Sequence, residues 1–247
     1  MKIVGLIPSR LASTRLPKKA LSLIRGIPLI AHVIKRSQMS SMLDKLYVAT
    51  DSTEIANIAK RCNCEVLFTK ESHPTGSDRI GEAAKSLDCD IVVNIQGDEA
   101  LVHPEHINDS AKLLLDRPDI EVAMLATQFN KRESISDVKV VISSDNEILY
   151  FSRADIPFNS KNMHKAYHVV SFRKEMLGKF CALSQTPLEL IESIEYMRLV
   201  ESGFRIGTKV IDSNAISVDT SEDLAIVSRM MEEDDLYDLY KNDFSIS

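Results

Sequence analysis

A basic, hydroxyl-rich segment follows the first apolar run of the chain. Residues 2–7 have the continuous apolar pattern of a buried strand, and the segment 8–19 that comes next contains Arg10, Ser13, Arg15 and Lys19. Guanidinium groups, an ammonium group and the backbone N–H groups of small residues all bind phosphate oxygens. The segment lacks the glycine spacing of a Walker loop and of a dinucleotide-binding fingerprint. It predicts either a phosphate site of another kind or a solvated basic loop.

Two carboxylates follow other predicted strands. Asp98 comes after the apolar run 91–95 and Gly97, and Asp219 comes directly after Val218. Carboxylate oxygens at strand ends suit Mg²⁺, a hard cation that is commonly held by one or two carboxylates and by substrate phosphates. The alternatives are a turn with solvated acids at Asp98, and a helix N-cap at Asp219 with Glu222 as its capping-box partner.

Two further segments contain groups that could bind an anion. Residues 74–79 form a turn that leads into a predicted helix, whose N-terminus could face a ligand. The plain alternative is a capped helix with Asp78 near its positive end. Arg153 follows the predicted strand 148–151 and is either an anion-binding group beside an apolar wall or a surface charge.

These residues have to be positioned by alternating strands and helices. In the first half we expect strands at 2–7, 46–49, 66–69 and 91–95, and helices at 29–39, 53–62, 77–87 and 104–115. In the second half we expect strands at 122–127, 138–142, 148–151, 166–172 and 205–210, and helices at 175–183, 188–201 and 219–233. The alternation predicts an α/β fold of three layers, Rossmann-like, with a mixed, mostly parallel sheet and helices on both faces.

We expect a single domain over residues 1–247, with a strand-rich extension around 122–210. Ligands of open α/β sheets bind beyond the carboxyl ends of the strands. The loops at 8–20, 70–79, 96–101 and 219–223 follow strand patterns, and we therefore expect them to converge.

Composition excludes several classes of protein. The 247 residues carry a net charge of −6, and no apolar run approaches the roughly 18 residues that a membrane helix needs. The acidic total argues against nucleic-acid binding. However, residues 1–43 contain eight Lys or Arg and no Asp or Glu, which suggests an anionic ligand held locally. The four cysteines have no metal-site spacing and are typical of thiols in a reducing cytoplasm. The acidic residues 232–247 are interpreted as a solvated end.

Taken together, these segments resemble the CMP-Kdo synthetase family, the 3-deoxy-manno-octulosonate cytidylyltransferases. The resemblance covers almost the whole chain, in the family's order. Its matching pieces are residues 7–10, 13–17 and 19, then 48–51, 75–79, 94–99, 150–153, 187–189 with 191–193, and 218–220 with 222–224.

The resemblance implies a nucleotidyltransferase fold, a homodimer, CTP as donor, Mg²⁺ as cofactor and a cytoplasmic enzyme of lipopolysaccharide or surface polysaccharide synthesis. By family role, Arg10, Ser13, Arg15 and Lys19 would hold the CTP phosphates, and Thr75, Gly76 and Ser77 would lie by the nucleoside with Asp78 and Arg79 nearby. Gln96, Arg153, Glu189 and Glu192 would face the sugar acid. Asp98 and Asp219 would bind the metal ion, and these two carboxylates and Lys19 would be the catalytic residues.

The chain departs from the family pattern on the sugar side. Ala100 stands where the family has Pro, and the stretch at 159–165 is shorter than usual. Ala166, His168 and Val170 stand where the family has His, Gly and Tyr, and Leu190 or Tyr196 stands where it has Gln. The implied acceptor is therefore Kdo or a close relative such as 8-amino-Kdo. Alternatives are a transferase of the same fold for a sugar 1-phosphate or a nonulosonate, and a non-catalytic nucleotide-binding relative.

Overall fold

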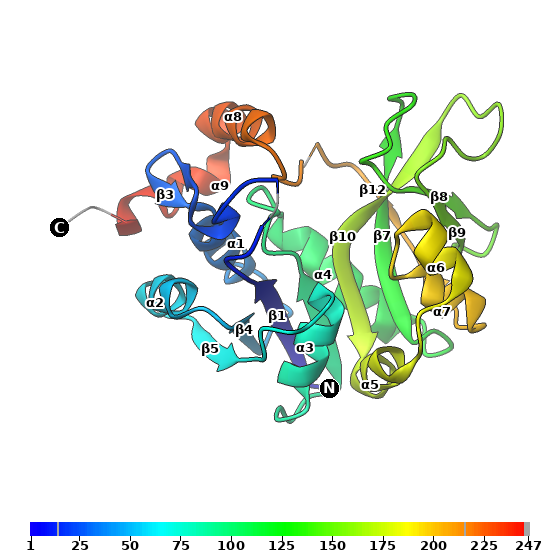
Figure 1. Ribbon diagram of the computed structural model, residues 1–247, viewed down its shortest axis with the longest axis horizontal. Helices are drawn as coiled ribbons and strands as arrows, with labels where there is room; N and C mark the ends of the chain where they lie inside the picture. The colour runs from blue at the N-terminus through cyan, green and yellow to red at the C-terminus, as the bar shows by residue number, and fades with distance from the viewer. Residues whose placement is uncertain (14, 215, 245–247) are drawn as a thin grey trace.

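The structure is a computed structural model that describes residues 1–13, 15–214 and 216–244. Its main sheet has the strand order β11-β7-β10-β6-β1-β4-β5, and Figure 1 shows helices packed on both of its faces. The strands are β1 (Ile3–Ser9), β4 (Lys45–Thr50), β5 (Glu65–Phe68), β6 (Ile91–Ile95), β7 (Val122–Phe129), β8 (Lys139–Ile142), β9 (Ile148–Ser152), β10 (Met163–Arg173), β11 (Ile206–Gly207) and β12 (Val210–Ile211). A separate hairpin pairs β2 (Leu23–Ile24) with β3 (Ile27–Pro28).

The helices alternate with the strands through the first half of the chain, as the sequence predicts. They are α1 (Leu29–Ser37), α2 (Thr53–Arg61), α3 (Gly76–Ala84), α4 (Pro104–Asp116), α5 (Lys174–Ala182), α6 (Pro187–Glu192), α7 (Met197–Glu201), α8 (Ser221–Met230) and α9 (Asp235–Asp238). Strand β1 pairs in parallel with β4 on one side and with β6 on the other. The predicted α/β architecture with a mixed, mostly parallel sheet is confirmed.

Strand β1 shows why a continuous apolar run becomes a central strand. All of its residues are buried, and successive side chains point to opposite faces of the sheet. Ile3 and Ile7 pack in the core under α1, α2 and α4, whereas Val4 and Leu6 pack in the core under α3 and α5. The two hydrophobic cores are therefore separated by the sheet, and together they fix the position of the loop that follows β1.

The second half adds antiparallel pairing to this sheet. Strand β10 lies antiparallel between β6 and β7 and also pairs with β8, which carries the edge hairpin to β9. Two predictions there are wrong. The helix expected at 188–201 is divided into α6 and α7, because Ser193 adopts a left-handed conformation with φ 54°. The strand expected at 205–210 is divided into β11 and β12, which both pair with β7.

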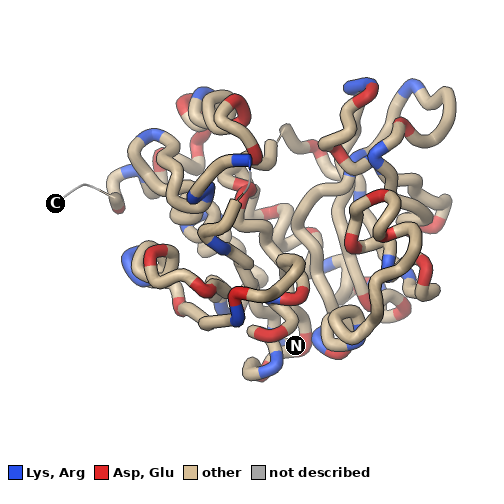
Figure 2. The backbone as a smooth tube through the Cα atoms, in the orientation of Figure 1, with Lys and Arg blue, Asp and Glu red and all other residues tan. Residues whose placement is uncertain are grey.

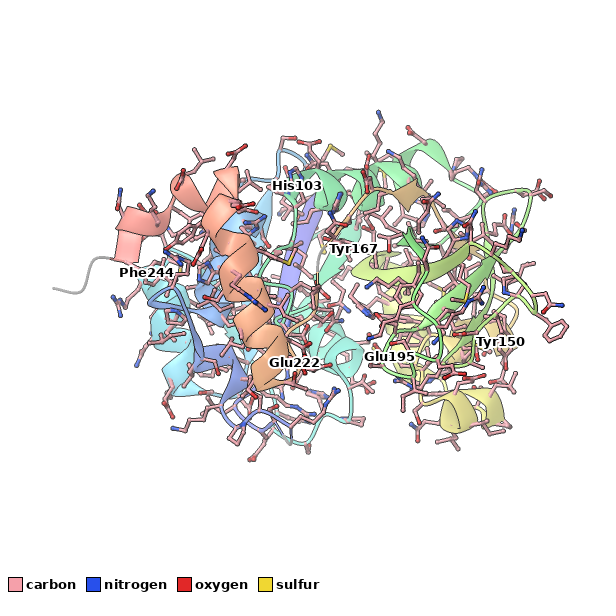
Figure 3. The ribbon with its side chains drawn as sticks, turned by 90° about the horizontal axis from the view of Figure 1, so that it is seen from above. His103, Tyr150, Tyr167, Glu195, Glu222 and Phe244 are labelled. Atoms are coloured by element: carbon pink, nitrogen blue, oxygen red, sulfur yellow. The ribbon has the colours of Figure 1, made fainter. Side chains whose placement is uncertain are left out.

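The interpretation of the acidic C-terminal segment as a solvated end is also wrong for the part that the structure describes. The side chain of Asp234 forms a bidentate ion pair with the buried Arg36 of α1, at 2.7 and 3.1 Å. Asp243 pairs with Lys35 at 2.6 Å, and Tyr240 is buried. In Figure 3, Phe244 lies beside the N-terminal elements at the edge of the molecule. The C-terminal segment thus completes the core on the α1 face.

Charges of both signs are interspersed over the molecule. Figure 2 shows Lys and Arg segments alternating with Asp and Glu segments along the whole chain. No helix among the described residues is long and apolar enough to cross a membrane. The eight basic residues of the first 43 are likewise divided among the start of β1, the loop after it, the turn between β2 and β3, and α1.

Candidate active site

The loop after β1 and the ends of two other segments enclose a small cavity, which we call the basic cavity. It has a volume of about 290 Å³ and is lined by Arg10, Ser13, Arg15 and Lys19 together with the carboxylate residues Asp98 and Asp219. Strand order explains this convergence, since β1 and β6 are parallel neighbours whose carboxyl ends meet at one edge of the sheet. The sequence prediction that these six residues lie together is thus met by the geometry. Thr14 of the same segment lies outside the described residues.

Lys19 is the centre of the charge arrangement. Its Nζ atom lies 2.7 Å from Oδ2 of Asp98 and 2.9 Å from Oδ1 of Asp219. Burial disfavours the ammonium form, but the neighbouring Asp98 and then Asp219 outweigh it, so the pKa of Lys19 is raised above its ordinary value. Arg15 pairs with the other side of Asp219, at 2.9 Å. Two carboxylates therefore stand close enough to share one cation.

The geometry decides between the two interpretations of Asp219. Thr220 is the N-cap of α8: its hydroxyl accepts from the backbone N–H of Asp223, and the carboxylate of Asp223 accepts from the backbone N–H of Thr220, which forms the capping box. Asp223 also accepts a hydrogen bond from the backbone N–H of Asp219, at 3.1 Å. Capping by Asp219 with Glu222 as partner is therefore wrong. The side chain of Asp219 is left to face Lys19 and Arg15.

A second space, which we call the central cavity, opens on the other side of the two carboxylates. It has a volume of about 600 Å³ and shares Arg15, Asp98 and Asp219 with the basic cavity. Gln96 and Arg153, both predicted to face a second substrate, line it. An anion in the basic cavity and a molecule in the central cavity would thus meet at the carboxylate pair.

Sequence reasoning missed several residues that line the central cavity. They are Ile135, Ser136, Val138, His168, Ser193 and Ser217. His168 was noted only as a departure from a family pattern; it lies within an irregularity of the β10–β7 register between Ala166 and Val170, and such irregularities redirect side chains. The others lie on loops or near strand ends, where no residue type or spacing indicated them.

A third space adjoins the central cavity on the side of β10, and we call it the side cavity. Its volume is about 510 Å³, and it shares His168, Ser217 and Asp219 with the central cavity. Glu99 lines it, is buried, and accepts a hydrogen bond from the hydroxyl of Ser217. Burial raises the pKa of the Glu99 carboxyl. The side cavity enlarges the space available to a molecule that enters beside Asp219.

The segment 75–79 forms the start of α3 beside this site. Thr75 caps the helix and donates its hydroxyl hydrogen to Asp78, and a side chain at Gly76 would contact Pro8 at 3.4 Å and approach Gln96. These contacts place the helix start next to the basic segment. The capped-helix interpretation is met, and Thr75 and Gly76 remain candidates for binding a nucleoside.

Ser77 and Arg79 are turned into the protein instead. The hydroxyl of Ser77 donates to Glu195 at 2.7 Å, and both residues of this bond are inside the fold. Arg79 is buried and contacts Asp51 at 3.2 Å and the hydroxyl of Thr69 at 2.5 Å. Their side chains therefore hold α3 in place. Glu195, which the sequence analysis passed over, is the partner that makes Ser77 structural.

The expectation that Glu189 lies at a substrate pocket needs correction. Its carboxylate is buried, completes the capping box of α6 with Thr186, and forms a bidentate ion pair with Arg198 at 2.5 and 2.8 Å. Glu192 does not line the central cavity and instead contacts residues next to it. It accepts hydrogen bonds from the hydroxyl of Ser152 at 2.8 Å and from the backbone N–H of Arg153 at 3.0 Å. Glu192 thus positions Arg153.

The donor set at the carboxylate pair fits Mg²⁺. Asp98 and Asp219 supply hard oxygen ligands at a half-buried position, with side chains that are 27% and 30% exposed. Within residues 1–13, 15–214 and 216–244, no group of three or more His, Cys, Asp or Glu side chains could hold a metal ion. A cation at this pair would therefore need further oxygen ligands from substrates, which is common for Mg²⁺ in phosphate-transferring enzymes.

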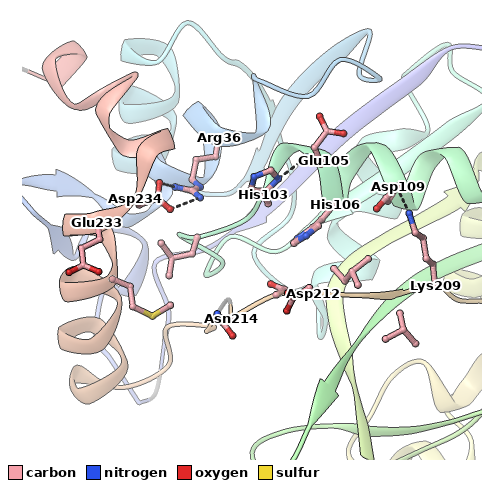
Figure 4. Close-up of a pocket in the computed structure, with 15 residues that line it drawn as sticks. Arg36, His103, Glu105, His106, Asp109, Lys209, Asp212, Asn214, Glu233 and Asp234 are labelled. Carbon is pink, nitrogen blue, oxygen red and sulfur yellow. Dashed lines mark hydrogen bonds and ion pairs between the residues drawn. The ribbon is translucent and has the colours of Figure 1, made fainter.

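Figure 4 shows another cavity, which neither Asp98 nor Asp219 lines. It has a volume of about 720 Å³ and lies between the start of α4, residues 209–214 and the end of α8. Its charged residues include two ion pairs, Arg36 with Asp234 and Lys209 with Asp109. His103 and His106 line it with their ring centroids 5.2 Å apart. It contains none of the predicted site residues.

A three-layer α/β fold with a basic loop after its first strand, and with two carboxylates that share the cation Lys19, fits a nucleotide-dependent transferase. The chain belongs to the cytidylyltransferase family, whose model matches residues 4–210. It is 38% identical over 241 residues to a 3-deoxy-manno-octulosonate cytidylyltransferase of Chlorobium phaeobacteroides, covering 94% of this chain and 98% of that protein. It is 34% identical over 244 residues to one of Fusobacterium nucleatum, covering 96% and 99%.

Two solved structures resemble the fold. One is a CMP:2-keto-3-deoxy-manno-octonic acid synthetase complexed with CTP, with a TM-score of 0.90, 30% identity, and coverage of 94% of this chain and 99% of that chain. The other is a cytidylyltransferase of Leptospira borgpetersenii, with a TM-score of 0.67 and 20% identity over 98% and 94% of the two chains. The resemblance drawn from the sequence motifs is thus confirmed at the level of the family and the fold.

Proposed function

We propose that this protein transfers CMP from CTP to the anomeric hydroxyl of Kdo or a closely related 3-deoxy-ulosonic acid, with release of pyrophosphate. One observation carries the proposal most directly. Arg15, Asp98 and Asp219 border both the basic cavity and the central cavity, so a triphosphate in one and an acid sugar in the other would meet at the carboxylate pair. Membership of the cytidylyltransferase family and the names of its relatives support the nucleotide and the sugar.

The mechanism requires positioning and charge neutralisation more than covalent catalysis. The hydroxyl oxygen of the sugar attacks the α-phosphorus of CTP, the bond to the β-phosphate breaks, and pyrophosphate leaves. Arg10, Arg15 and Lys19 bind the phosphates and offset the negative charge that grows on the leaving group. Gln96 and Arg153 border the space for the acceptor and orient it for attack.

Mg²⁺ is the cofactor that we propose for the carboxylate pair. Asp98 and Asp219 would hold it, and it would supply Lewis-acid chemistry, polarising phosphate oxygens and making the attacking hydroxyl more acidic. In the structure Lys19 pairs with both carboxylates. Lys19 would therefore have to turn toward the phosphates when a metal ion binds.

The decisive experiment measures pyrophosphate release from CTP against a panel of 3-deoxy-ulosonic acids. Turnover with Kdo or 8-amino-Kdo is the expected result. Release only with a sugar 1-phosphate or a nonulosonate would assign another acceptor to the same fold. Tight CTP binding without turnover on any acceptor would indicate a non-catalytic relative. We further propose that the enzyme is cytoplasmic and activates a sugar for lipopolysaccharide or another surface polysaccharide.

We also propose that the protein is a homodimer. Apolar side chains are exposed on neighbouring edge elements: Leu149 of β9 is 53% exposed, and Leu190 and Ile191 of α6 are 60% and 76% exposed. The hydroxyl of Tyr150 on β9 lies 3.5 Å from Glu192 of α6, which makes the two elements adjacent. A second copy would cover this surface. Ile191→Asp is expected to convert a dimer to a monomer in sedimentation velocity, and an unchanged mass would contradict this interface.

A further inference from the structure

The loop formed by residues 134–137 is part of the wall of two cavities beside the carboxylate pair. Ile135 and Ser136 line the central cavity, and Ser136 and Asp137 line the side cavity. A loop in this position influences which molecules fit only if its main chain is held still. Within the loop, one side-chain hydrogen bond helps to fix the main chain: the hydroxyl of Ser134 donates to the carboxylate of Asp137 at 2.6 Å.

The stronger support is the side chain of Lys139, the first residue of β8. Lys139 is fully buried, and its Nζ atom donates hydrogen bonds to the backbone carbonyls of Ser134 at 2.5 Å, Asp137 at 2.8 Å and Arg153 at 2.5 Å. An ammonium group has three donors, so all of them are used. One buried cation thus ties both ends of the 134–137 loop to the main chain of Arg153.

Arg153 binds the middle of the same loop. Its Nη1 atom donates to the carbonyl of Ile135 at 2.9 Å and lies 3.5 Å from that of Ser136. Its Nε atom donates to the carbonyl of Glu192 at 3.0 Å, which joins the loop to the end of α6. The four successive carbonyls of the loop therefore face two cationic side chains, those of Lys139 and Arg153. Lys139 also binds the backbone carbonyl of Arg153.

We propose that Lys139 is a positioning residue for the acceptor: it fixes the 134–137 loop and Arg153 relative to one another and so sets the shape of the central cavity. The proposal rests on the proposed function, because it takes the central cavity as the place of the sugar acid. Burying an ammonium group is unfavourable unless its hydrogen bonds are complete, and here every bond is made to a segment that borders the cavity.

The test compares Lys139→Met and Lys139→Gln with Lys174→Met. Lys174 is the matched control, because its ammonium also donates to a backbone carbonyl, that of Leu87. Lys174 follows the C-terminal end of β10, whereas Lys139 pairs near the N-terminal end of that strand. For Lys139→Met we expect the KM for the sugar acid to rise at least about tenfold, with the KM for CTP unchanged within about twofold. Lys139→Gln keeps two N–H donors, so its KM for the sugar acid should lie between those of the unmodified protein and of Lys139→Met. Lys174→Met should leave both KM values unchanged.

Amide hydrogen exchange in the absence of substrate supplies a second measurement. Exchange at residues 134–137 should be faster in Lys139→Met than in the unmodified protein, and unchanged in Lys174→Met. Unchanged exchange, an unchanged KM for the sugar acid, or loss of folding in both Lys139 variants would each overturn the proposal. If the unmodified protein releases no pyrophosphate with any sugar acid, the proposed function fails, whereas the exchange result still decides whether Lys139 holds the loop.

Discussion

The backbone N–H of Val218 donates a hydrogen bond to the carbonyl oxygen of Asp98, at 3.0 Å. This bond joins the segment after β6 to the segment before α8, which lie in opposite halves of the chain. Because Asp219 follows Val218 directly, the bond places two carboxylates close enough for the ammonium of Lys19 to contact both. The pairing of the two acids is thus built into the main chain and does not depend on a bound cation.

Replacing Asp98 tests the metal assignment. Asp98→Asn removes one negative charge and one oxygen ligand while keeping the size of the side chain. We expect turnover with CTP and Mg²⁺ to fall by about a hundredfold or more, since a metal ion stabilises the transition state by several kcal/mol. The measurement is pyrophosphate release, with thermal unfolding as the check on the fold.

Glu222→Gln is the matched control for this substitution, because Glu222 lies in the first turn of α8, three residues beyond Asp219 along the chain. It should keep near-normal turnover. Near-normal activity of Asp98→Asn with Mg²⁺ would show that the metal assignment is wrong.

Lys19 is expected to compete with a metal ion for the carboxylate pair. Without nucleotide, its ammonium neutralises Asp98 and Asp219 at 2.7 and 2.9 Å. Lys19→Met removes this competitor, and we expect the affinity for Mn²⁺, measured by electron paramagnetic resonance, to rise by about tenfold or more. Lys18→Met, which loses only an exposed pair with Glu54, should leave it unchanged. Weaker Mn²⁺ binding by Lys19→Met would place the metal elsewhere.

Glu189 tests the corrected role of an acid that had been expected at the substrate. Its ion pair with Arg198 is buried, with side chains that are 4% and 5% exposed. Glu189→Gln leaves the guanidinium without its counter-charge, which should lower the free energy of unfolding by about 3–5 kcal/mol.

Chemical denaturation measures this loss, and the double variant Glu189→Met with Arg198→Met should recover much of it, because no unpaired buried charge remains. The KM of folded Glu189→Gln for the sugar acid should stay within about twofold of the unmodified value. A stable Glu189→Gln protein with a strongly raised KM would restore the pocket assignment.

His32 predicts how stability depends on pH. Its Nε2 donates to the carbonyl of Ile24 at 3.0 Å and its Nδ1 accepts from the hydroxyl of Tyr240 at 2.8 Å, because a carbonyl can only accept. Burial lowers the pKa of His32 from 6.5 to about 4. The unfolded chain therefore binds more protons than the folded protein between these values, and the free energy of unfolding falls as pH is lowered through this window.

The loss attributable to His32 is about 3 kcal/mol at most, from the size of the shift. His106, whose pKa burial also lowers to about 4, adds a loss of the same sign. Urea unfolding between pH 7 and pH 4.5 should show a shallower decline for His32→Leu than for the unmodified protein. Equal slopes in the two proteins would contradict the role assigned to His32.

The fold was predictable wherever local pattern and tertiary position agree. The apolar run at β1 indicates a buried strand, and the capping serine before α2 indicates the start of a helix. The carboxyl ends of parallel strands then bring Arg10, Lys19 and Asp98 together. The division of the helix expected at 188–201 was not predictable, because Ser193 gives no local signal for a left-handed conformation. At the end of α6 the carbonyls of Glu192 and Ser193 accept hydrogen bonds from Arg153, a contact with a distant part of the chain that no local pattern indicates.

The structure brings the residues expected at the phosphates together around one cavity, but it buries Ser77, Arg79 and Glu189, which motifs had also placed at the substrates. Asp219 could be a cap or a ligand from its sequence, and only the capping by Thr220 decides between them. Glu189 and Glu192 matched a motif, but a motif does not show that one acid meets Arg198 and the other supports Arg153. Lys139 gave no signal, since its partners are backbone carbonyls that any residue provides.

The position of the C-terminal segment has a consequence for the order of folding. Arg36 of α1 is buried, but its counter-ion Asp234 is made almost 200 residues later, and the hydroxyl partner of His32 is Tyr240. Until the ribosome has added those residues, Arg36 of the first helix lacks the carboxylate partner that it has when it is buried in the folded protein. The N-terminal half therefore cannot reach its final packing during synthesis, and closure of the molecule awaits contacts of very high sequence separation, which form slowly.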